Sequence, residues 1–382
     1  MDTEPTRLQQ MSPSIPKPPT PLSRFFSSLY ANNFLLGIIF SIMLALAYPK
    51  LGAVYLFPSI TSTYIAVIYI FLMSGISLKS HQLMNAFSNI RFNLFVQFYN
   101  LILVSMLTVA LTKFLLFIDA TTDELADGMV ITASLPMTIN MVIVLTIAAG
   151  GDEASAVFNA AVGNLLGVFI TPALVLLFLN SANSISFANV LFKLSVRVLL
   201  PLVVGQLIQY KAPPIKDYVD SNKPLFKKSQ ELTLTYIVYT TFCTTFYSDS
   251  DPDAAQADLA YIIVMGVILT LHICFLMGLS WYTFGYFYKD EPELRVFALF
   301  GGTHKTLSMG IPLLSAMFEG DQRLGLFTLP ILVWHPVQLI LGSMVTPRLK
   351  EWAEAERGRL GPKVAAVVKQ EDDGDVAPNN VL

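Results

Sequence analysis

The sequence predicts an all-α integral membrane protein in which ten transmembrane helices form two inverted repeats of five. Three observations lead to this prediction. The 382-residue chain is 54% hydrophobic and only 13% charged, whereas a soluble domain carries about 25% charged residues. Its apolar residues gather in ten long stretches. A short motif, LGxxxTP, ends two of these stretches, at residues 166–172 and, 175 positions later, at residues 341–347.

The ten apolar stretches are the predicted membrane spans. A helix needs roughly 20 apolar residues to cross the hydrocarbon core of a bilayer, and each stretch is close to that length or exceeds it. The lipid bilayer is therefore the expected surrounding, and the net charge of −3 gives no sign of nucleic-acid binding. The spans are residues 33–49, 59–78, 92–117, 124–149, 155–179, 188–210, 229–248, 258–287, 293–318 and 324–346.

The charges in the short loops predict the orientation, because Lys and Arg are retained on the cytoplasmic side of a membrane. With ten spans, the loops on one side hold only Lys50 and Arg323. The loops on the other side, where both tails also lie, hold Lys79, Arg91, Lys211, Lys216, Lys223, Lys227, Lys228 and Lys289. Both termini are therefore expected in the cytoplasm, with the protein in the plasma membrane or an endomembrane.

The chain divides into a helical domain and two tails. Residues 1–32 are rich in proline and are expected to be an extended cytoplasmic tail. Residues 33–346 are the ten-helix domain, with repeats at about 33–179 and 188–346. Residues 347–382 are expected to be a second cytoplasmic tail, disordered at its acidic end. The two cysteines lie in separate apolar spans, so no disulfide is expected.

The fourth and ninth spans contain residues that interrupt helices. The fourth has Pro136, and the ninth has Gly301, Gly302 and, 176 residues after the first proline, Pro312. One Pro or Gly often only kinks a membrane helix. Two interruptions at matching positions, together with the repeated LGxxxTP, predict a pair of broken helices. Because five crossings turn the second half upside down, this outline is typical of a secondary transporter.

Polar side chains beside the first interruption form a candidate cation site. Ser155 and Asn159 are four residues apart and share a face of a helix that begins after two glycines, with Asp152 as its expected cap. Asn140 can reach them if the preceding helix is broken. Such neutral oxygens suit a weakly held monovalent cation. The alternative is that these side chains only join helices by hydrogen bonds.

Lys305 is the most informative residue of the ninth span, where Thr303, His304 and Thr306 accompany it. An ammonium near the bilayer centre costs about 2.5–3.5 kcal/mol even on an insertion scale, which indicates a function. It could neutralise an anionic substrate, replace a coupling cation or titrate. The alternatives are a structural pair with a carboxylate such as Asp127, or a side chain that reaches the membrane surface.

These motifs together resemble the bile acid:sodium symporter superfamily (solute carrier family 10), and within it the branch that contains sodium/bile acid cotransporter 7. The resemblance covers roughly residues 30–350. It rests on SGISLK at 74–79, LPMTIN at 135–140, GGDEASAVFN at 150–159, the first LGxxxTP and KTLSMGIP at 305–312. It implies ten helices in a panel domain and a core domain, crossing broken helices, and transport by alternating access.

The resemblance also implies where ligands bind. Gln97, Asn140, Ser155 and Asn159 correspond to the sodium-site residues of the family, and sodium is the only cofactor-like ion expected. A small organic anion is expected to meet the polar residues of the two interruptions, which are Thr138, Asn140, Thr303, His304, Lys305 and Thr306. The chain departs from the family in two places: Ile139 replaces a usual hydroxyl residue, and the ninth span lacks an acidic residue and has Lys305 instead.

The sequence therefore favours a secondary active transporter of a small organic anion, driven by sodium or protons. Because members of this branch are associated with calcium homeostasis, the resemblance also leaves open a membrane regulator of calcium entry that acts through partner proteins. An enzyme is not expected, since no HExxH motif and no paired intramembrane carboxylates occur. Nothing in the sequence indicates an oligomeric state.

Overall fold

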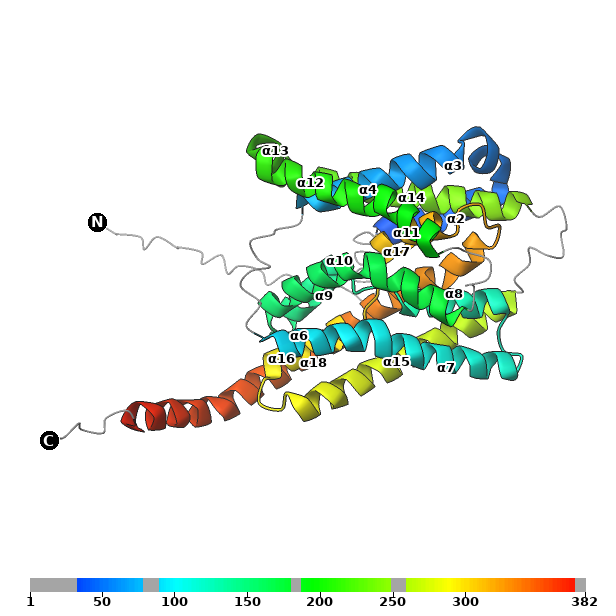
Figure 1. Cartoon of the computed structure of the whole chain (residues 1–382). Helices are drawn as coiled ribbons and strands as arrows, with labels where there is room; N and C mark the ends of the chain where they lie inside the picture. Colours follow the sequence, from blue (N-terminus) through cyan, green and yellow to red (C-terminus); the bar gives the residue numbers. More distant parts are fainter. Residues whose placement is uncertain (1–32, 78–88, 180–186, 249–258, 375–382) are drawn as a thin grey trace, which may run out of the picture.

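A computed structural model describes residues 33–77, 89–179, 187–248 and 259–374 (Figure 1). Within these ranges the secondary structure is helical throughout, and no strand is formed. The proline-rich tail predicted at residues 1–32 lies outside the described residues.

The helices of the first half end at residue 178. They are α2 (Asn33–Ala47), η1 (Leu51–Tyr55), α3 (Pro58–Ile60), η2 (Thr61–Ala66), α4 (Val67–Ser77), α6 (Ile90–Gln97), η4 (Phe98–Leu103), α7 (Val104–Phe117), α8 (Asp123–Ala133), α9 (Ile139–Ala148) and α10 (Glu153–Phe178), where η marks a π-helical segment.

The second half begins at residue 187. Its helices are α11 (Phe187–Leu194), η6 (Ser195–Leu199), α12 (Leu200–Lys211), α13 (Pro213–Ser221), α14 (Lys223–Ser248), α15 (Leu259–Phe287), α16 (Pro292–Thr303), α17 (Leu307–Met317) and α18 (Leu324–Gly374). Each of the ten predicted spans coincides with one helix or with consecutive helical segments.

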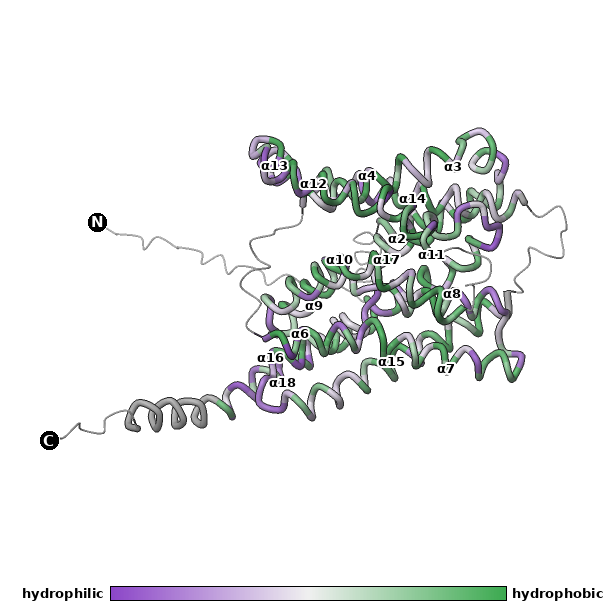
Figure 2. Tube along the Cα trace, in the orientation of Figure 1, coloured by the Kyte–Doolittle hydropathy of each residue, from purple (hydrophilic) through white to green (hydrophobic). Residues whose placement is uncertain are grey.

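Six helical stretches are long and apolar enough to cross a membrane, judged by length and composition. They are Pro58–Ser77, Ile90–Phe117, Glu153–Phe178, Ala188–Lys211, Tyr261–Phe287 and Leu324–Leu360. Shorter apolar helices occupy Leu36–Ala47 and Ile139–Ala148. Figure 2 shows that hydrophobic residues dominate the long helices, and many large apolar side chains are exposed, Phe40 and Leu177 by 68% and 69%. The protein is therefore a multi-pass membrane protein.

The helices form two groups that lie one above the other in Figure 1. The first helix group, residues 33–77 and 187–248, contains α2, α3, α4, α12, α13 and α14 in the upper part of the view. The second helix group, residues 89–179 and 259–360, contains α6 to α10, α15, α16 and α18 in the lower part. Helix α17 connects them, since it contacts α11 and α14 of the first group as well as α18 of the second.

The first helix group is held by a close crossing of α4 and α12, the two helices that touch most extensively. Gly75 and Gly205 meet at this crossing. A Cβ atom on Gly75 would lie 2.3 Å from the carbonyl oxygen of Leu202, and one on Gly205 would lie 2.4 Å from that of Leu72. Only glycine allows two helix backbones to approach this closely.

Aromatic rings fill the interior of the second helix group. Phe92 of α6 lies edge-on to Phe284 of α15 and to Phe297 of α16, with ring centroids 5.9 Å apart in both pairs. Tyr99 adds a further contact with Phe284 at 5.5 Å. All four side chains are fully buried, so this cluster fixes α6, α15 and α16 relative to one another.

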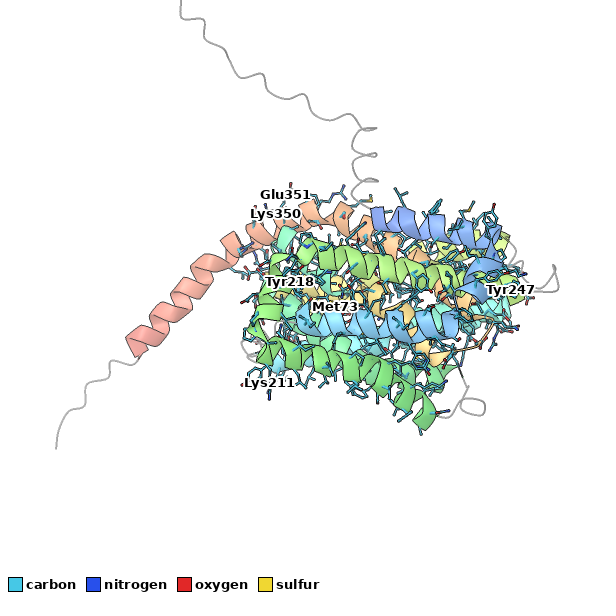
Figure 3. All side chains as sticks on the ribbon, turned by 90° about the horizontal axis from the view of Figure 1, so that it is seen from above. Met73, Lys211, Tyr218, Tyr247, Lys350 and Glu351 are labelled. Carbon is cyan, nitrogen blue, oxygen red and sulfur yellow. The ribbon has the colours of Figure 1, made fainter. Side chains whose placement is uncertain are left out.

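The two ends of the helix bundle carry different residues. In Figure 3, Lys211, Tyr218, Lys350 and Glu351 lie at one end of the molecule, and Tyr247 lies at the other. The sequence analysis places Lys211 and the C-terminal segment on the same side of the membrane, in agreement with this arrangement. That this side is the cytoplasm stays a prediction from the loop charges.

Helix α18 is longer than the sequence analysis expected. The last span was predicted to end at residue 346, with a tail that becomes disordered near residue 371, but α18 continues to Gly374. Residues 348–360 are rich in Lys, Glu, Arg, Ala and Leu, which are strong helix formers. Their first part also packs on the second helix group, where Trp352 meets Trp281 with ring centroids 4.6 Å apart.

Candidate functional site

The fourth predicted span is broken, as expected. Helix α8 ends at Ala133, α9 begins at Ile139, and residues 134–138 between them are not helical. Pro136 accounts for this locally, because its ring disfavours a helical conformation at the preceding residue and it has no N–H to donate. The break is buried at every residue.

Four carbonyl groups of this break accept hydrogen bonds from other parts of the chain. The carbonyl of Ser134 accepts a hydrogen bond from the Thr171 hydroxyl at 2.7 Å, and that of Met137 accepts one from the Asn164 amide at 2.8 Å. The carbonyls of Leu135 and Pro136 are bound from the second broken helix, described next. Non-helical backbone survives at membrane depth only when its polar groups are satisfied in this way.

The ninth predicted span is also broken, between α16 and α17, where His304, Lys305 and Thr306 are not helical. The amide of Thr306 donates to the carbonyl of Pro136 at 3.0 Å, so the two breaks contact each other directly. Asn100 of η4 donates to the carbonyls of Gly301 and Gly302 at 3.0 and 3.2 Å. The two breaks therefore meet in the interior of the protein, although Gly301, Gly302 and Pro312, which were predicted to interrupt the ninth span, are themselves helical.

Lys305 joins the two breaks through its side chain, which is completely buried. Its Nζ donates to the Asn100 carbonyl at 2.6 Å, to Asn100 Oδ1 at 3.2 Å and to the Leu135 carbonyl at 2.9 Å. These three acceptors match the three donors of an ammonium group. The Nζ atom is thus surrounded by neutral oxygens.

Both structural alternatives for Lys305 are wrong. Since the side chain is fully buried, it does not extend to the membrane surface. It does not pair with Asp127 either, and no carboxylate of the described residues forms an ion pair with it. Its three hydrogen bonds go to Asn100 and Leu135, which hold it at the place where the two breaks cross.

A cluster of amide side chains lies between α6 and α10. The Gln97 amide donates to the carbonyl and to Oδ1 of Asn159, at 2.7 and 3.2 Å. Asn159 Nδ2 in turn donates to Asn93 Oδ1 at 2.7 Å and to the Ser155 carbonyl at 2.9 Å. Asp152 caps α10 as predicted, since its Oδ2 accepts from the Ser155 amide at 2.8 Å.

The amide cluster has one free acceptor. Gln97 Oε1 is buried and has no hydrogen-bond partner among the described residues. A buried oxygen without a donor is costly unless a bound ion or water uses it, so this donor set fits a monovalent cation. No group of three or more His, Cys, Asp and Glu side chains suited to a metal ion occurs among the described residues.

Asn140 differs from the residues of this cluster in its exposure. The structure brings Gln97, Ser155 and Asn159 together, but Asn140 is exposed in the first turn of α9. Asn93, which completes the cluster, was missed in the sequence analysis. The available signal was its position four residues before Gln97, which places both amides on one helix face.

The remaining predicted site residues surround the crossing and are buried. Thr138 occupies the N-cap position of α9, and the Thr306 hydroxyl caps α17 by accepting from the Met309 amide at 3.4 Å. Thr303 donates to the Leu299 carbonyl at 2.7 Å. His304 has a buried Nε2 without a partner among the described residues.

The glycines of both LGxxxTP motifs lie against the breaks. A Cβ atom on Gly167 would be 2.6 Å from Cγ of Pro136 in the first break. One on Gly342 would be 3.0 Å from Nε2 of His304 in the second. The repeated motif therefore marks the two helices, α10 and α18, that pack on the broken segments.

Each of these helices also supplies an amide side chain to the neighbouring break. Asn164 of α10 binds the first break, as described above. Gln338 of α18 binds the second with two bonds, accepting from the Lys305 amide at 2.7 Å and donating to its carbonyl at 2.8 Å. Gln338 was not among the predicted site residues, although an amide within an apolar span was a usable signal.

Comparison with known proteins identifies the family of this chain. The profile of the SBF-like CPA transporter family matches residues 32–351. Sodium/bile acid cotransporter 7-B of Xenopus laevis is 35% identical over 331 residues, which are 86% of this chain and 94% of that protein. Sodium/bile acid cotransporter 7 of Rattus norvegicus is 35% identical over 325 residues, 84% of this chain and 92% of that protein. The chain therefore belongs to the SBF-like CPA transporter family, as the resemblance in its motifs indicated.

Proposed function

We propose that this protein is a secondary active transporter that moves a small organic anion by alternating access, with sodium as the coupling ion. The observation that carries the proposal is the crossing of the two breaks, where Thr306 binds Pro136 and Lys305 is buried between them. Broken helices that meet inside a bundle expose backbone dipoles to a ligand at membrane depth.

The fold in this proposal has ten spans in two inverted repeats, residues 33–179 and 188–346. The matched pairs support it: Gly167 and Gly342 each lie on a break, and Asn164 and Gln338 each bind one. The first helix group corresponds to the panel domain of the family and the second to its core domain. Movement of one group relative to the other would expose the crossing to each side in turn.

The sodium ion in this proposal binds at the amide cluster of Gln97, Ser155 and Asn159. Gln97 Oε1 is the supporting feature, because it is a buried acceptor without a donor. Asn93 adds a further amide through its bond to Asn159. Asn140, the fourth predicted ligand, is exposed here and would join the set only after α9 has moved.

The anionic character of the substrate follows from the charge at the crossing. Lys305 contributes a buried positive charge, and none of the described carboxylates pairs with it. In a low-dielectric interior an unpaired cation makes the surrounding potential positive, which favours an anion. Thr138, Thr303, His304 and Thr306 supply the polar groups that would orient it.

Uptake into proteoliposomes under an imposed sodium gradient tests this function. The substrate panel starts with taurocholate, since the relatives are named as bile acid cotransporters, and continues with smaller carboxylates and sulfonates. We expect sodium-driven uptake by the wild type. Because Gln97 carries the free acceptor, Gln97→Leu should raise the sodium concentration for half-maximal uptake at least about tenfold, one lost ligand being worth about 1.4 kcal/mol.

Asn222→Leu is the matched control, since Asn222 directly follows α13 and its side-chain amide donates to the Tyr218 carbonyl of that helix, far along the chain from the amide cluster. It should leave sodium dependence unchanged. Equal sodium dependence in both variants would refute the proposed ion site. If no anion is taken up in any gradient while deletion of the protein still alters cell calcium, the regulator of calcium entry is the better description.

A further inference from the structure

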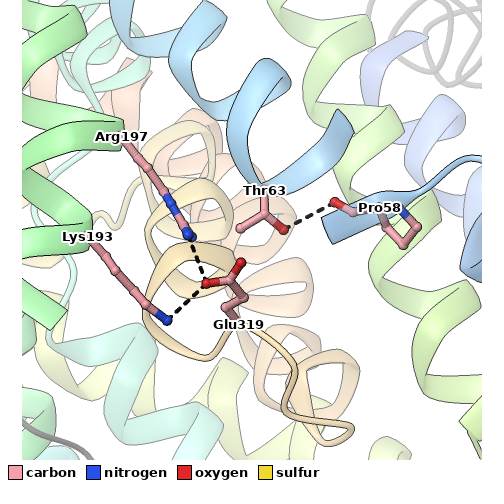
Figure 4. A network of polar contacts seen from close by, with 5 residues as sticks. All are labelled: Pro58, Thr63, Lys193, Arg197 and Glu319. Carbon is pink, nitrogen blue, oxygen red and sulfur yellow. Dashed lines mark hydrogen bonds and ion pairs between the residues drawn. The ribbon is translucent and has the colours of Figure 1, made fainter. Parts of the chain in front are cut away.

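Two cations and one carboxylate meet at the boundary between the helix groups (Figure 4). Lys193 of α11 and Arg197 of η6 belong to the first helix group. Glu319 lies in the turn that follows α17, between that helix and α18. A single oxygen, Glu319 Oε2, accepts from Lys193 Nζ at 2.9 Å and from Arg197 Nη2 at 2.8 Å.

The charges of this contact do not balance. Two positive side chains share one carboxylate, which leaves one positive charge in excess. The Arg197 side chain is only 2% exposed, and its Nη1 has no hydrogen-bond partner among the described residues. Its guanidinium carbon lies 3.7 Å from the ring centroid of Tyr64, a face that attracts a cation but offers no acceptor for Nη1.

The contact is open to solvent on one side. The Lys193 side chain is 34% exposed and that of Glu319 is 23% exposed. An anion from solution can therefore reach both residues, while Arg197 forms the buried base of the contact. A guanidinium beside an ammonium is a common arrangement for binding carboxylate, sulfonate or phosphate groups, because arginine offers two parallel donors.

We propose that Lys193 and Arg197 form a binding site for the oxyanion group of the transported anion, and that Glu319 occupies this site in the present structure. The proposal rests on the proposed function, since it assigns an entry site to the same substrate. The incoming oxyanion displaces Glu319 and takes both of its donors, and it also satisfies Nη1 of Arg197.

Displacement of Glu319 would separate the two helix groups at this point. Among the described residues, the pairs of Glu319 with Lys193 and Arg197 are the only ion pairs that join the first group to the second. An oxyanion at the site therefore replaces a contact between the groups by a contact with substrate. In the predicted orientation this end of the bundle faces away from the cytoplasm, so the site would admit substrate from that side.

Binding of sulfate to the purified protein tests this inference. Sodium sulfate is titrated at constant ionic strength, with sodium chloride as the balancing salt, and binding is followed by isothermal titration calorimetry. A tethered carboxylate competes at a high effective concentration. Glu319→Gln removes the competing charge and should lower the dissociation constant for sulfate at least about tenfold. Lys193→Gln should raise it by a similar factor.

Asp321→Asn is the matched control. Asp321 is a carboxylate two residues away in the same turn, and its recorded partner is the neighbouring Arg323. This variant should bind sulfate like the wild type. Lys193 and Glu319 are both partly exposed, so their variants should fold even if a change at the buried Arg197 does not.

The inference is overturned if Glu319→Gln binds sulfate no more tightly than Asp321→Asn, or if Lys193→Gln binds it as well as the wild type. Uptake separates this failure from that of the proposed function. If these variants take up anions normally and bind sulfate like the wild type, the oxyanion site is refuted and the proposed transport function still stands. If sulfate binding changes as expected but no anion is taken up, the oxyanion site is supported and the proposed transport function is refuted.

Discussion

The two breaks differ in what they offer to each other. The first break presents acceptors, because the carbonyls of Leu135 and Pro136 point to the crossing. The second presents donors, namely Lys305 Nζ and the Thr306 amide. One half of the chain therefore supplies the negative ends of dipoles and the other supplies a charge. The two halves of the chain therefore contribute complementary groups to one site, acceptors from the first and donors from the second, rather than forming two copies of the same site.

The largest expected effect on stability concerns the amides that support the breaks. Gln338→Leu removes both partners of the Lys305 backbone, and each buried group left unsatisfied costs about 1–3 kcal/mol. We expect a loss of about 3 kcal/mol in the unfolding free energy in detergent micelles. Asn164→Leu removes one bond to the first break and should cost about half as much. Equal losses of unfolding free energy in the two variants would contradict the conclusion that the second break depends on its supporting amide more than the first does.

The glycines of the two LGxxxTP motifs should respond differently to a methyl group. In Gly167→Ala the new atom would meet the rigid ring of Pro136 at 2.6 Å, which should cost about 2 kcal/mol. In Gly342→Ala the nearest atom is a terminal methyl of Leu145 at 2.8 Å, which can rotate away, so the cost should be smaller. Both costs are measured as the decrease in the unfolding free energy of the variant relative to the wild type.

Gly278→Ala is the control for the glycine pair, because a Cβ atom there meets nothing within 4 Å. It should be neutral or slightly stabilising, since alanine favours a helix by about 1 kcal/mol over glycine. A cost at Gly278 similar to that at Gly167 would mean that steric contact with the break is not the cause.

The threonines of the two motifs provide a finer comparison. Thr171 donates across to the Ser134 carbonyl in the first break, whereas Thr346 donates to Gly342 in its own helix. Thr171→Val should therefore cost about 1 kcal/mol of unfolding free energy, and Thr346→Val about 0.5 kcal/mol or less. A reversed order would show that the shared motif does not have the roles described here.

The smallest expected effect is a pH dependence at the boundary between the helix groups. Burial raises the pKa of Glu319, but the hydrogen bonds and charges of Arg197 and Lys193 lower it more, so the pKa lies below its ordinary value of 4.5. The stabilisation is therefore complete above about pH 4.5 and is lost as the pH falls through the depressed pKa. The difference in melting temperature between wild type and Glu319→Gln should vanish on acidification below that value.

The sequence was sufficient to predict the helices and their interruptions. Pro136 acts locally, since proline disturbs a helix whatever surrounds it, and the first break occurs as predicted. The second break lies at residues 304–306, whereas Gly301 and Gly302 are helical in α16 and Pro312 lies inside α17. The length of α18 was not predicted, because a charged segment after a membrane span resembles a tail until its contacts are known. The packing of Trp352 on Trp281 is such a contact.

The site was only partly predictable, because its contacts join distant parts of the chain. Lys305 was identified as a buried charge, but its partner Asn100 lies 205 residues away. Asn93 and Gln338 were missed although both are amides within apolar spans, and their partners could not be predicted because an amide in a single sequence does not reveal what it will bind. Asn140 was placed in the cation site because a broken helix would let it reach Ser155 and Asn159 and because the family resemblance implies it, and it is exposed in the structure.

We propose that transport takes place at the crossing of the two breaks, where Lys305 provides the charge. The most direct measurement is the initial rate of sodium-driven anion uptake into proteoliposomes by Lys305→Gln, compared at equal amounts of folded protein with Lys228→Gln, which alters an exposed lysine. The account predicts a loss of at least about tenfold for Lys305→Gln, because more than about 1.4 kcal/mol of interaction with the anion is removed, and no loss for Lys228→Gln. Uptake by Lys305→Gln at the wild-type rate would contradict it.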